Sequence, residues 1–368
     1  MRRRSDHGAG RSARAYRIGV TLAIASAVLP LLAAAPQPRG HPASRLPDTD
    51  EATEYWDVVA RFDSQHALFA RFMITNEGPG ERTATAYGHV IEPDGTTRFF
   101  SNGRRQGHWQ LGAQGLRLQV GSSLLDLTGP EVALRVHKQK KGVDIDLRFT
   151  PDGPFWGAAS PAGVPPVDLL AVAAPISGHY WFRGMEAPVA LSGRVGLSHT
   201  WMRRSEPDVA LRRTDFFSLQ GGPAVYLRDF EAPDGTRARW LAVAEHGEIL
   251  FQTNDFAVSE TGRAAAQRDA GYPLPATLGI RGPKLSGRIQ IGAGLLHHDP
   301  MEVMPQPFRF LLSFKMRPHR VWADSAFEVT YQNGSEAVKI RGTGIATVTF
   351  LNPIPPKTSL ASPPCRGV

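Results

Sequence analysis

The chain of 368 residues contains a single cysteine, Cys365, close to its C-terminal end. An intramolecular disulfide is therefore excluded, and the position of this thiol in the tail argues against a cysteine nucleophile. Long amphipathic helical patterns are also missing, and the best candidate for a helix is the short stretch 260–270. Stability must therefore come from the burial of apolar side chains, for which a chain of this length suffices.

Signatures of common enzyme classes are missing as well. The sequence has no Gly-x-Ser-x-Gly elbow, phosphate-binding loop or dinucleotide fingerprint, and we expect no cofactor. The run His297-His298-Asp299, together with His319, raises the idea of a metal site. Adjacent residues of a strand point to opposite faces, so one strand cannot present both histidines to one ion. No metal site is assigned.

The basic excess belongs largely to the N-terminus. Six arginines and one aspartate lie before an apolar run from Ile18 to Ala35. This run ends in three alanines before Pro36. A basic start, an apolar middle and a small-residue end are typical of a secretory signal, over 1–35. Its removal lowers the basic residues from 42 to 36 and the acidic residues from 34 to 33. A mature chain with so small an excess is not expected to bind nucleic acid.

Strand patterns fill most of the remaining chain. The segment 143–149 alternates apolar and polar residues throughout, and 116–120, 132–136, 189–195 and 285–291 repeat this period of two. Each such strand has one buried and one wet face, which is typical of antiparallel sheets. Pro-Asp-Gly at 93–95, 151–153 and 233–235 and Asn333-Gly334 predict tight turns. The fold class is therefore all-β.

The pattern divides the chain into five parts. After the signal we expect a flexible leader over 36–50 and a first β-domain over 51–205. The polar run 203–208 interrupts the apolar pattern and places the boundary before a second β-domain over 206–352. The tail 353–368 is rich in proline and is expected to be loosely ordered.

Several motifs resemble the lipocalin-like superfamily of carotenoid 1,2-hydratases and AttH-like secreted proteins. They are Glu54-Tyr55-Trp56, His179-Tyr180-Trp181 with Gly196–Trp201, Phe216–Gln220, Gly271–Leu274 and Tyr331–Gly334. This resemblance implies two tandem lipocalin-like antiparallel β-barrel domains. It also implies that the protein handles a hydrophobic molecule, with His179-Tyr180-Trp181 in the pocket.

The sequence departs from the family pattern at two acidic positions. Met202–Glu206 stands where many members have an acidic cluster, and Tyr331–Gly334 lacks the glutamate of the family's late motif. Hydration of an isolated alkene demands a strong, positioned acid, so these changes weigh against that reaction. The loss of these acidic residues favours a binding function, or a reaction in which the shape of the site and the orientation of the substrate do most of the catalysis.

The candidate site follows from these motifs. We expect the ligand to be bound by Tyr55, Trp56, Trp181, Trp201, Arg203 and Arg204, with the arginines at the rim. In an enzyme the acid would be His179, Tyr180 or Asp215. Each residue also has an ordinary reading: the tryptophans as core, His179 as a strand-end residue, and the charged residues as a solvated turn or a surface ion pair.

Three functions remain open. The first is an exported protein that binds a lipid, terpenoid or polyene in an aromatic-lined pocket. The second is a hydratase, isomerase or cyclase that acts on such a molecule. The third is a structural or glycan-contacting protein of the cell envelope. Proximity to a membrane surface is compatible with each, and the sequence does not define an oligomeric state.

Cleavage of the signal gives the first testable prediction. If the chain is exported to the periplasm or beyond and cut after Ala35, Edman sequencing of the mature protein begins at Pro36. A mature protein that still begins at Met1 would mean that the apolar run is retained as an anchor or is not a signal.

Overall fold

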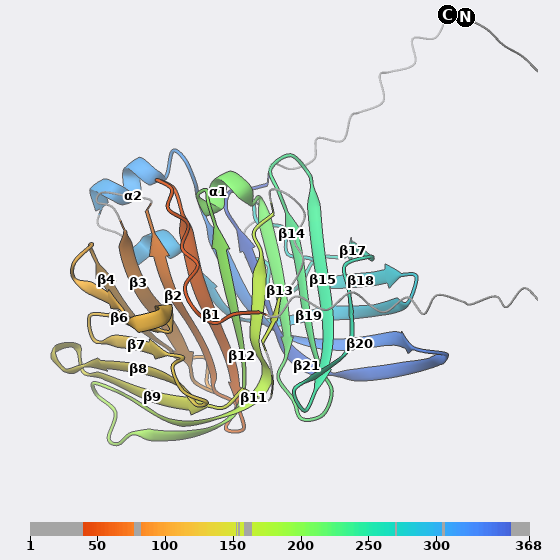
Figure 1. Cartoon of the computed structure of the whole chain (residues 1–368), viewed down its shortest axis with the longest axis horizontal. Helices are drawn as coiled ribbons and strands as arrows, with labels where there is room; N and C mark the ends of the chain where they lie inside the picture. Colours follow the sequence, from red (N-terminus) through yellow and green to blue (C-terminus); the bar gives the residue numbers. More distant parts are fainter. Residues whose placement is uncertain are drawn as a thin grey trace, which may run out of the picture. The chain divides into compact units, whose positions relative to one another are not determined.

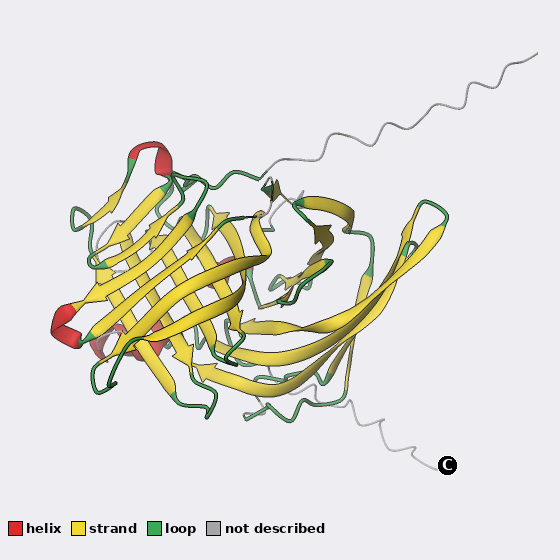
Figure 2. Ribbon diagram, turned by 90° about the horizontal axis from the view of Figure 1, so that it is seen from below, coloured by secondary structure: helices red, strands yellow, loops and turns green. Residues whose placement is uncertain are grey.

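The computed structural model describes residues 40–76, 82–151, 153, 155–157, 164–268, 271–303 and 306–354. The predicted signal, its cleavage position and the tail beyond residue 354 lie outside these residues. Within them the chain forms two antiparallel sheets, one a nearly closed barrel and the other a half-barrel (Figures 1 and 2). The expected all-β fold of two tandem lipocalin-like units is confirmed.

The first sheet runs in the order β4-β3-β2-β1-β12-β11-β9-β8-β7-β6-β5, with β10 paired to β11. Its strands are β1 (Thr53–Phe62), β2 (Ala67–Thr75), β3 (Thr83–Ile91), β4 (Thr97–Arg104), β5 (Trp109–Leu111), β6 (Arg117–Val120), β7 (Ser123–Asp126), β8 (Val132–Lys138), β9 (Val143–Phe149), β10 (Trp156–Gly157), β11 (Val167–Phe182) and β12 (Val189–Met202). The short helical turns η1 (Ala113–Gly115) and η2 (Gln139–Lys141) lie between strands.

The second sheet runs in the order β16-β15-β14-β13-β21-β20-β19-β18-β17. Its strands are β13 (Arg212–Ser218), β14 (Ala224–Glu231), β15 (Arg237–Glu245), β16 (Glu248–Thr253), β17 (Ala257–Thr261), β18 (Thr277–Gly282), β19 (Leu285–His298), β20 (His319–Asn333) and β21 (Glu336–Phe350). The helices are α1 (Glu206–Val209), η3 (Pro300–Val303) and α2 (Gln306–Leu312). The predicted domain boundary falls at Ser205, the residue before α1.

Two of the three Pro-Asp-Gly turns have the expected geometry, whereas the third, at 151–153, includes a residue outside the described ones. Gly95 and Gly235 take φ of 86° and 84°, in the region that glycine occupies without strain. Each donates its N–H to the carbonyl three residues before it, at 2.9 and 3.0 Å. Each preceding aspartate accepts the N–H of the following threonine at 2.8 Å. These two turns join β3 to β4 and β14 to β15, so the repeated Pro-Asp-Gly motif builds equivalent hairpins in the two sheets.

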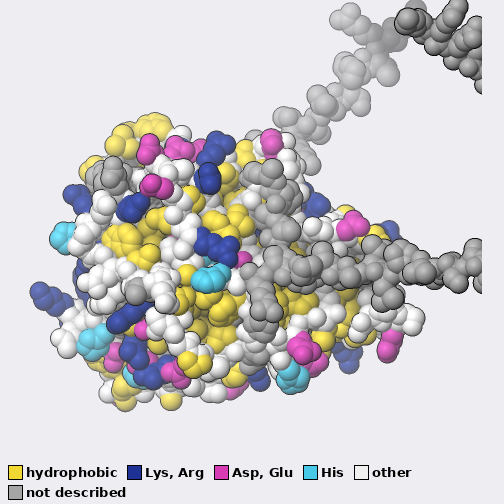
Figure 3. All heavy atoms as spheres, viewed as in Figure 1, with side chains coloured by type: hydrophobic (Ala, Val, Ile, Leu, Met, Phe, Trp, Pro, Cys, Tyr) yellow, Lys and Arg dark blue, Asp and Glu magenta, His cyan; other side chains and the backbone are white. Residues whose placement is uncertain are grey.

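One local prediction is wrong. The stretch 260–268 forms no helix, because β17 extends to Thr261 and Gly262 then takes a left-handed φ of 67°. The segment expected to be a leader contacts the first barrel from His41 onward: the His41 N–H donates to Asp168 at 2.9 Å, and the Arg45 N–H donates to Glu54 at 2.6 Å. These carboxylates tie the leader to the end of the first barrel. Three exposed apolar side chains, Phe310, Leu311 and Phe314, lie in α2 and just after it, and Figure 3 shows apolar atoms at this part of the surface.

Candidate functional site between the two sheets

Each sheet has its own apolar core, and a third core lies where the two sheets face each other. On β1, Trp56 and Val58 point into the first core, whereas Val59 points outward to the shared one. Phe217 of β13 and Trp322 of β20 belong to the same shared core. A Cβ atom at Gly196 of β12 would overlap the Phe217 ring, so the sheets approach closely here. The outer faces of the central strands are therefore buried.

Buried ion pairs surround this shared core. Arg71 of β2 donates two hydrogen bonds of 2.6 Å to Asp57 of β1, the residue directly opposite it. Arg228 of β14 likewise pairs at 2.7 Å with Asp215 of β13, its cross-strand neighbour. Arg213 joins the two pairs, since it contacts Asp215 at 2.7 Å and Asp57 of the other sheet at 3.3 Å. These five side chains form a continuous network across the two sheets.

Glu206 and Tyr55 extend this network. Glu206 of α1 accepts from Arg213 at 3.0 Å and from Arg71 at 3.4 Å. Tyr55 of β1 accepts a hydrogen bond from Arg213 and carries the Arg71 guanidinium 3.9 Å above its ring. Buried charges that are paired and hydrogen-bonded are tolerated in a protein interior. Each charged side chain of this network therefore has a partner of opposite charge, although Nε of Arg213 and Nη2 of Arg228 form no hydrogen bond with a described residue.

The protonation states follow from these contacts. Burial would raise the pKa of Asp215, but Arg228 and Arg213 outweigh it and the pKa falls below its ordinary value. Asp215 is thus held as a carboxylate. Burial lowers the pKa of Arg213 to about 10, which leaves it cationic at neutral pH. Burial raises the pKa of Tyr226 well above its ordinary value, and its hydroxyl donates to Asp215 at 2.8 Å.

Beside the network lies a second set of buried polar side chains, and several of their atoms have no hydrogen-bond partner among the described residues. We call it the histidine cluster: His89 of β3, His298 of β19, Arg320 and Trp322 of β20, and Thr347 of β21. Both ring nitrogens of His89, Nε2 of His298, Nε1 of Trp322 and Oγ1 of Thr347 are buried without a hydrogen-bond partner among the described residues. The five side chains belong to residues that are at most 6% exposed.

The rings of the cluster are packed against one another. His89 and His298 meet edge to face with ring centroids 4.7 Å apart, and Trp322 lies about 6 Å from both. Arg320 stands beside His298 on the neighbouring strand, and its guanidinium donates to the Tyr87 hydroxyl at 2.9 Å. Two imidazole rings, an indole N–H and a guanidinium group are therefore buried next to one another.

Both histidines are neutral at physiological pH. Burial, followed by the nearby charge of Arg320, lowers the pKa of His89 to about 4. Burial, followed by His89 and Arg320, lowers the pKa of His298 to about 3. A neutral imidazole has one N–H donor and one acceptor nitrogen. The cluster can therefore bind polar atoms of a ligand through hydrogen bonds without first losing a proton.

One aromatic side chain connects the cluster to the surface. Phe99 of β4 is 39% exposed, and its ring centroid lies 4.8 Å from that of His89 and 6.1 Å from that of His298. On the inner side, Phe69 packs on Trp322 with a centroid separation of 4.1 Å. The unpartnered groups thus lie between aromatic rings, one of which reaches solvent.

The structure does not bring the predicted site residues together. Tyr55 and Asp215 lie in the ion network between the sheets. Trp56 points into the first barrel and stacks on His199 at 4.6 Å, and Trp201 beside it lies under Arg45 at 4.4 Å. These two tryptophans therefore belong to the end of the barrel that the leader covers.

The remaining predicted residues lie elsewhere. Tyr180 is buried near the His66 ring and shares a hydrogen bond of 3.0 Å with it. Its hydroxyl donates to Glu92 at 3.2 Å. Burial, together with the charge of Glu92, raises the pKa of Tyr180 to about 12. His179 is on the opposite face of β11, beside Asp144 at 3.6 Å, and Trp181 donates to the Met185 carbonyl at 3.0 Å. Arg203 and Arg204 are exposed.

The sequence reasoning missed the residues of the histidine cluster apart from the run around His298. Its argument that neighbouring histidines face opposite ways is correct: Nδ1 of His297 lies 3.2 Å from Nε2 of His319, whereas His298 faces His89. A usable signal was a spacing of two between charged and aromatic residues, which places them on the same face of a strand. Arg213, Asp215 and Phe217 have this spacing, as do Arg320 and Trp322.

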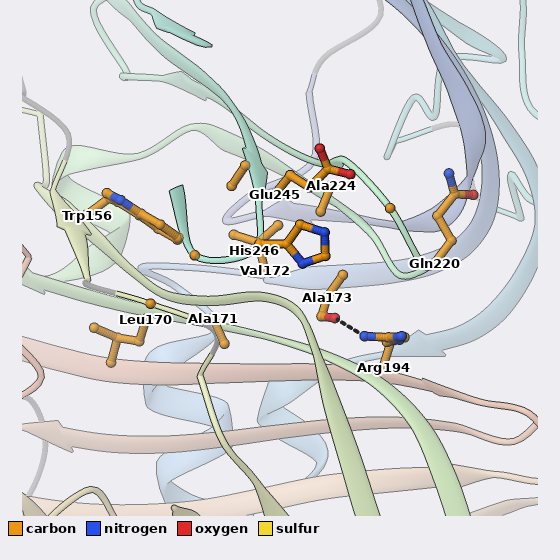
Figure 4. A pocket seen from close by; sticks show the side chains of 14 residues that line it. Trp156, Leu170, Ala171, Val172, Ala173, Arg194, Gln220, Ala224, Glu245 and His246 are labelled. Atoms are coloured by element: carbon orange, nitrogen blue, oxygen red, sulfur yellow. Dashed lines mark hydrogen bonds between the residues drawn. The ribbon is translucent and has the colours of Figure 1, made fainter. Parts of the chain in front are cut away.

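Two hollows of the surface are not lined by the unpartnered polar groups of the histidine cluster. One of about 100 Å³ lies between β11, β12 and the β15–β16 turn, where Arg194 donates to the Ala173 carbonyl at 3.2 Å (Figure 4). It is too small for an ordinary organic ligand. A second, of about 370 Å³, lies beside α2, and its Arg309 is paired with Asp299 at 3.1 Å.

Two further features of the described residues concern a metal site and a membrane-spanning helix. No group of three or more metal-type side chains is found there. Among the helices of the same residues, none has the length and apolar character needed to cross a membrane.

Comparison with known proteins shows the fold. No protein-family model matches the chain, and no curated protein matches its sequence. Among solved structures, the AttH-like protein NE1406 of Nitrosomonas europaea has a TM-score of 0.58 and 13% identity, covering 82% of this chain and 93% of that one. CghA with Sch210972 has a TM-score of 0.57 and 11% identity, covering 85% and 94%.

Kievitone hydratase from Nectria haematococca is also similar, with a TM-score of 0.53 and 9% identity over 86% of this chain and 94% of that one. The resemblance expected from the sequence, to the lipocalin-like superfamily of carotenoid hydratases and AttH-like proteins, is confirmed at the level of the fold. Identities this low carry over the fold and leave the chemistry to the residues of this chain.

The lowered histidine pKa values predict a pH dependence of stability. In the unfolded chain His298 titrates near its ordinary value of 6.5, whereas in the fold it stays neutral down to about pH 3. The unfolded state therefore binds the proton first, and the free energy of unfolding falls as the pH drops below 6.5. We expect His298→Gln to remove about 3 kcal/mol of this loss between about pH 7 and 4.

Urea unfolding at several pH values measures this effect. His179→Gln is the matched control, because it removes a half-exposed histidine that lies outside the histidine cluster. Equal slopes for the wild type and His298→Gln would show that His298 is not buried in a neutral form.

Proposed function

We propose that the protein binds a small molecule with an apolar body at the histidine cluster between the two sheets. One observation carries this proposal: several buried polar side-chain atoms meet at one place without a partner among the described residues. Leaving such a group unpaired costs about 1–3 kcal/mol, and native proteins keep few of them. A ligand that supplies the missing hydrogen bonds accounts for this cost.

The surroundings define the rest of the ligand. Phe69, Phe99 and Trp322 present ring faces and edges around the polar atoms. Aromatic rings bury large area with little conformational freedom to lose, which suits a flat or conjugated molecule. A polyene, terpenoid or polyphenol-like compound with a polar end therefore fits this site, in agreement with the apolar ligand expected from the sequence.

An enzymatic role is the second candidate, and the two neutral histidines favour it. A neutral imidazole can take a proton from a carbon next to a carbonyl and return it elsewhere, which is an isomerisation, or assist the addition of water to a conjugated double bond. The name of kievitone hydratase shows that this fold is used by a hydratase. At neutral pH these histidines are weak acids, so an activated double bond is a better substrate than an isolated alkene.

Export remains part of the proposal. A basic start followed by an apolar run and Ala33-Ala34-Ala35 supports secretion or periplasmic location of the mature protein. A binder of apolar molecules outside the cytoplasm would meet its ligand near a membrane surface. The hydrophobic small molecule is the one partner that this proposal names.

Blocking the exposed edge of the site tests binding. Retinol serves as a neutral, conjugated probe, and its fluorescence is followed as protein is added. Phe99→Asp places a charge against His89 and is expected to weaken retinol binding tenfold or more, about 1.4 kcal/mol. Leu111→Asp is the matched control, since Leu111 is 37% exposed on the same sheet and lies outside the cluster.

Three results are informative. Weaker binding by Phe99→Asp alone places retinol at the histidine cluster. Equal weakening by both substitutions, or no effect of either, means that retinol binds elsewhere and contradicts the proposed site. Binding too weak to detect in the wild type also counts against an apolar-ligand function.

The enzymatic role has its own test. Protein is incubated with a lipid extract of the host, and compounds that gain one water or change retention time at constant mass are followed by liquid chromatography and mass spectrometry. His89→Gln is expected to slow such turnover at least a hundredfold. His179→Gln, on the exposed side of β11, is the control and retains it. The absence of any wild-type change would favour pure binding.

A further inference from the structure

The buried charges between the sheets do not balance. Four guanidinium groups are buried there, those of Arg71, Arg213, Arg228 and Arg320. Three carboxylates lie against them, those of Asp57, Glu206 and Asp215. One positive charge is thus left over within the described part of the interface.

Arg320 carries the excess charge. Unlike Arg71, Arg213 and Arg228, it forms no ion pair with any described carboxylate. Its guanidinium donates to Tyr87 at 2.9 Å and to Thr349 at 3.1 Å, and both acceptors are neutral hydroxyls. The rings of Phe69 and Trp322 lie 5.3 and 5.6 Å from its central carbon, which offsets part of the cost of burying the charge.

The unpartnered groups around Arg320 are mostly donors. Nε1 of Trp322 is a donor only, Oγ1 of Thr347 can donate, and each neutral histidine has one N–H to give. Trp322 and Thr347 are directly opposite on β20 and β21, and His298 is opposite Arg320. The cluster thus offers a positive charge and several hydrogen-bond donors, and it lacks acceptors with a negative charge.

We propose that the ligand of this site carries a carboxylate or an equivalent organic anion, which Arg320 and the Trp322 N–H bind. This inference rests on the proposed function and narrows it to an apolar molecule with an anionic end. The apolar body would lie toward Phe99, where the cluster reaches solvent. Hydrogen bonds between an anion and a guanidinium are shorter and stronger than neutral ones, so the anion would contribute much of the affinity.

Substitution of Arg320 is expected to affect the stability of the ligand-free protein less than substitution of the neighbouring arginines. Removing Arg71 leaves Asp57 buried without its bidentate partner, which destabilises the fold strongly. Removing Arg320 takes away a charge that has no ion-pair partner. Arg320→Met keeps the length of the apolar stem but removes the hydrogen bonds to Tyr87 and Thr349, so the ligand-free protein is expected to unfold at a urea concentration close to that of the wild type.

A matched pair of probes tests the proposal. Retinoic acid and retinol share the polyene body and differ in the carboxylate, and both are titrated into the full-length mature protein. The wild type is expected to bind retinoate at least tenfold more tightly than retinol. In Arg320→Met this preference is expected to disappear, because the affinity for retinoate falls at least tenfold more than the affinity for retinol.

A second variant covers the case in which Arg320→Met does not fold. Trp322→Phe keeps an aromatic ring and removes the N–H, and it is expected to lower the affinity for retinoate several-fold more than the affinity for retinol. Leu111→Asp, outside the cluster, leaves both affinities unaltered. Inorganic phosphate at millimolar concentration is added as a competitor, and it is not expected to displace retinoate.

The outcomes separate the two proposals. Retinol binding that responds to Phe99→Asp, without any preference for retinoate, overturns the anion inference and leaves the binding site in place. A retinoate preference that survives in both Arg320→Met and Trp322→Phe also overturns it. Displacement of retinoate by phosphate would mean a site for small free anions instead of an anionic end on an apolar ligand. Loss of the preference in either variant, with retinol binding retained, supports the inference.

Discussion

The ion pair between Arg213 and Asp57 is the contact on which the arrangement of the two sheets depends. It joins the second sheet to the first, and its partners Asp215 and Arg71 extend it into both. Apolar contacts alone would let two sheets slide over each other, because the hydrophobic effect has no direction. Charged groups that are buried and paired have a narrow set of allowed positions, so they fix one alignment. The histidine cluster exists only in that alignment, since its residues come from both sheets.

Much of the fold could be predicted because period-two alternation and turn residues act locally. β9 alternates between buried and partly exposed residues as its sequence indicates, and Asn333-Gly334 forms the β20–β21 turn. The site could not be predicted in the same way. Tyr55, Asp57 and Arg71 have the appearance of the polar face of surface strands, and only the packing of the second sheet turns that face into an interior.

The motif His179-Tyr180-Trp181 illustrates the same limit. Three neighbouring residues of a strand cannot all face one pocket, and here Tyr180 points into the first barrel whereas His179 and Trp181 point away. A contiguous motif can identify a strand of a fold, as this one did. Assembly of a site requires residues that are distant in sequence, such as His89 and His298, whose proximity is a property of the tertiary structure.

The pairing of β1 with β12 has a consequence for how the chain folds. Thr53 lies opposite Met202, and in the second sheet Arg212 lies opposite Phe350, so each sheet joins its first strand to its last. Such pairings require the ends of a long loop to meet, and the loss of chain entropy must be overcome before any contact is gained. Proteins rich in these non-local contacts fold slowly. Each sheet of this protein can therefore close only after its last strand has been synthesised, and the polypeptide spends a long time as an open chain.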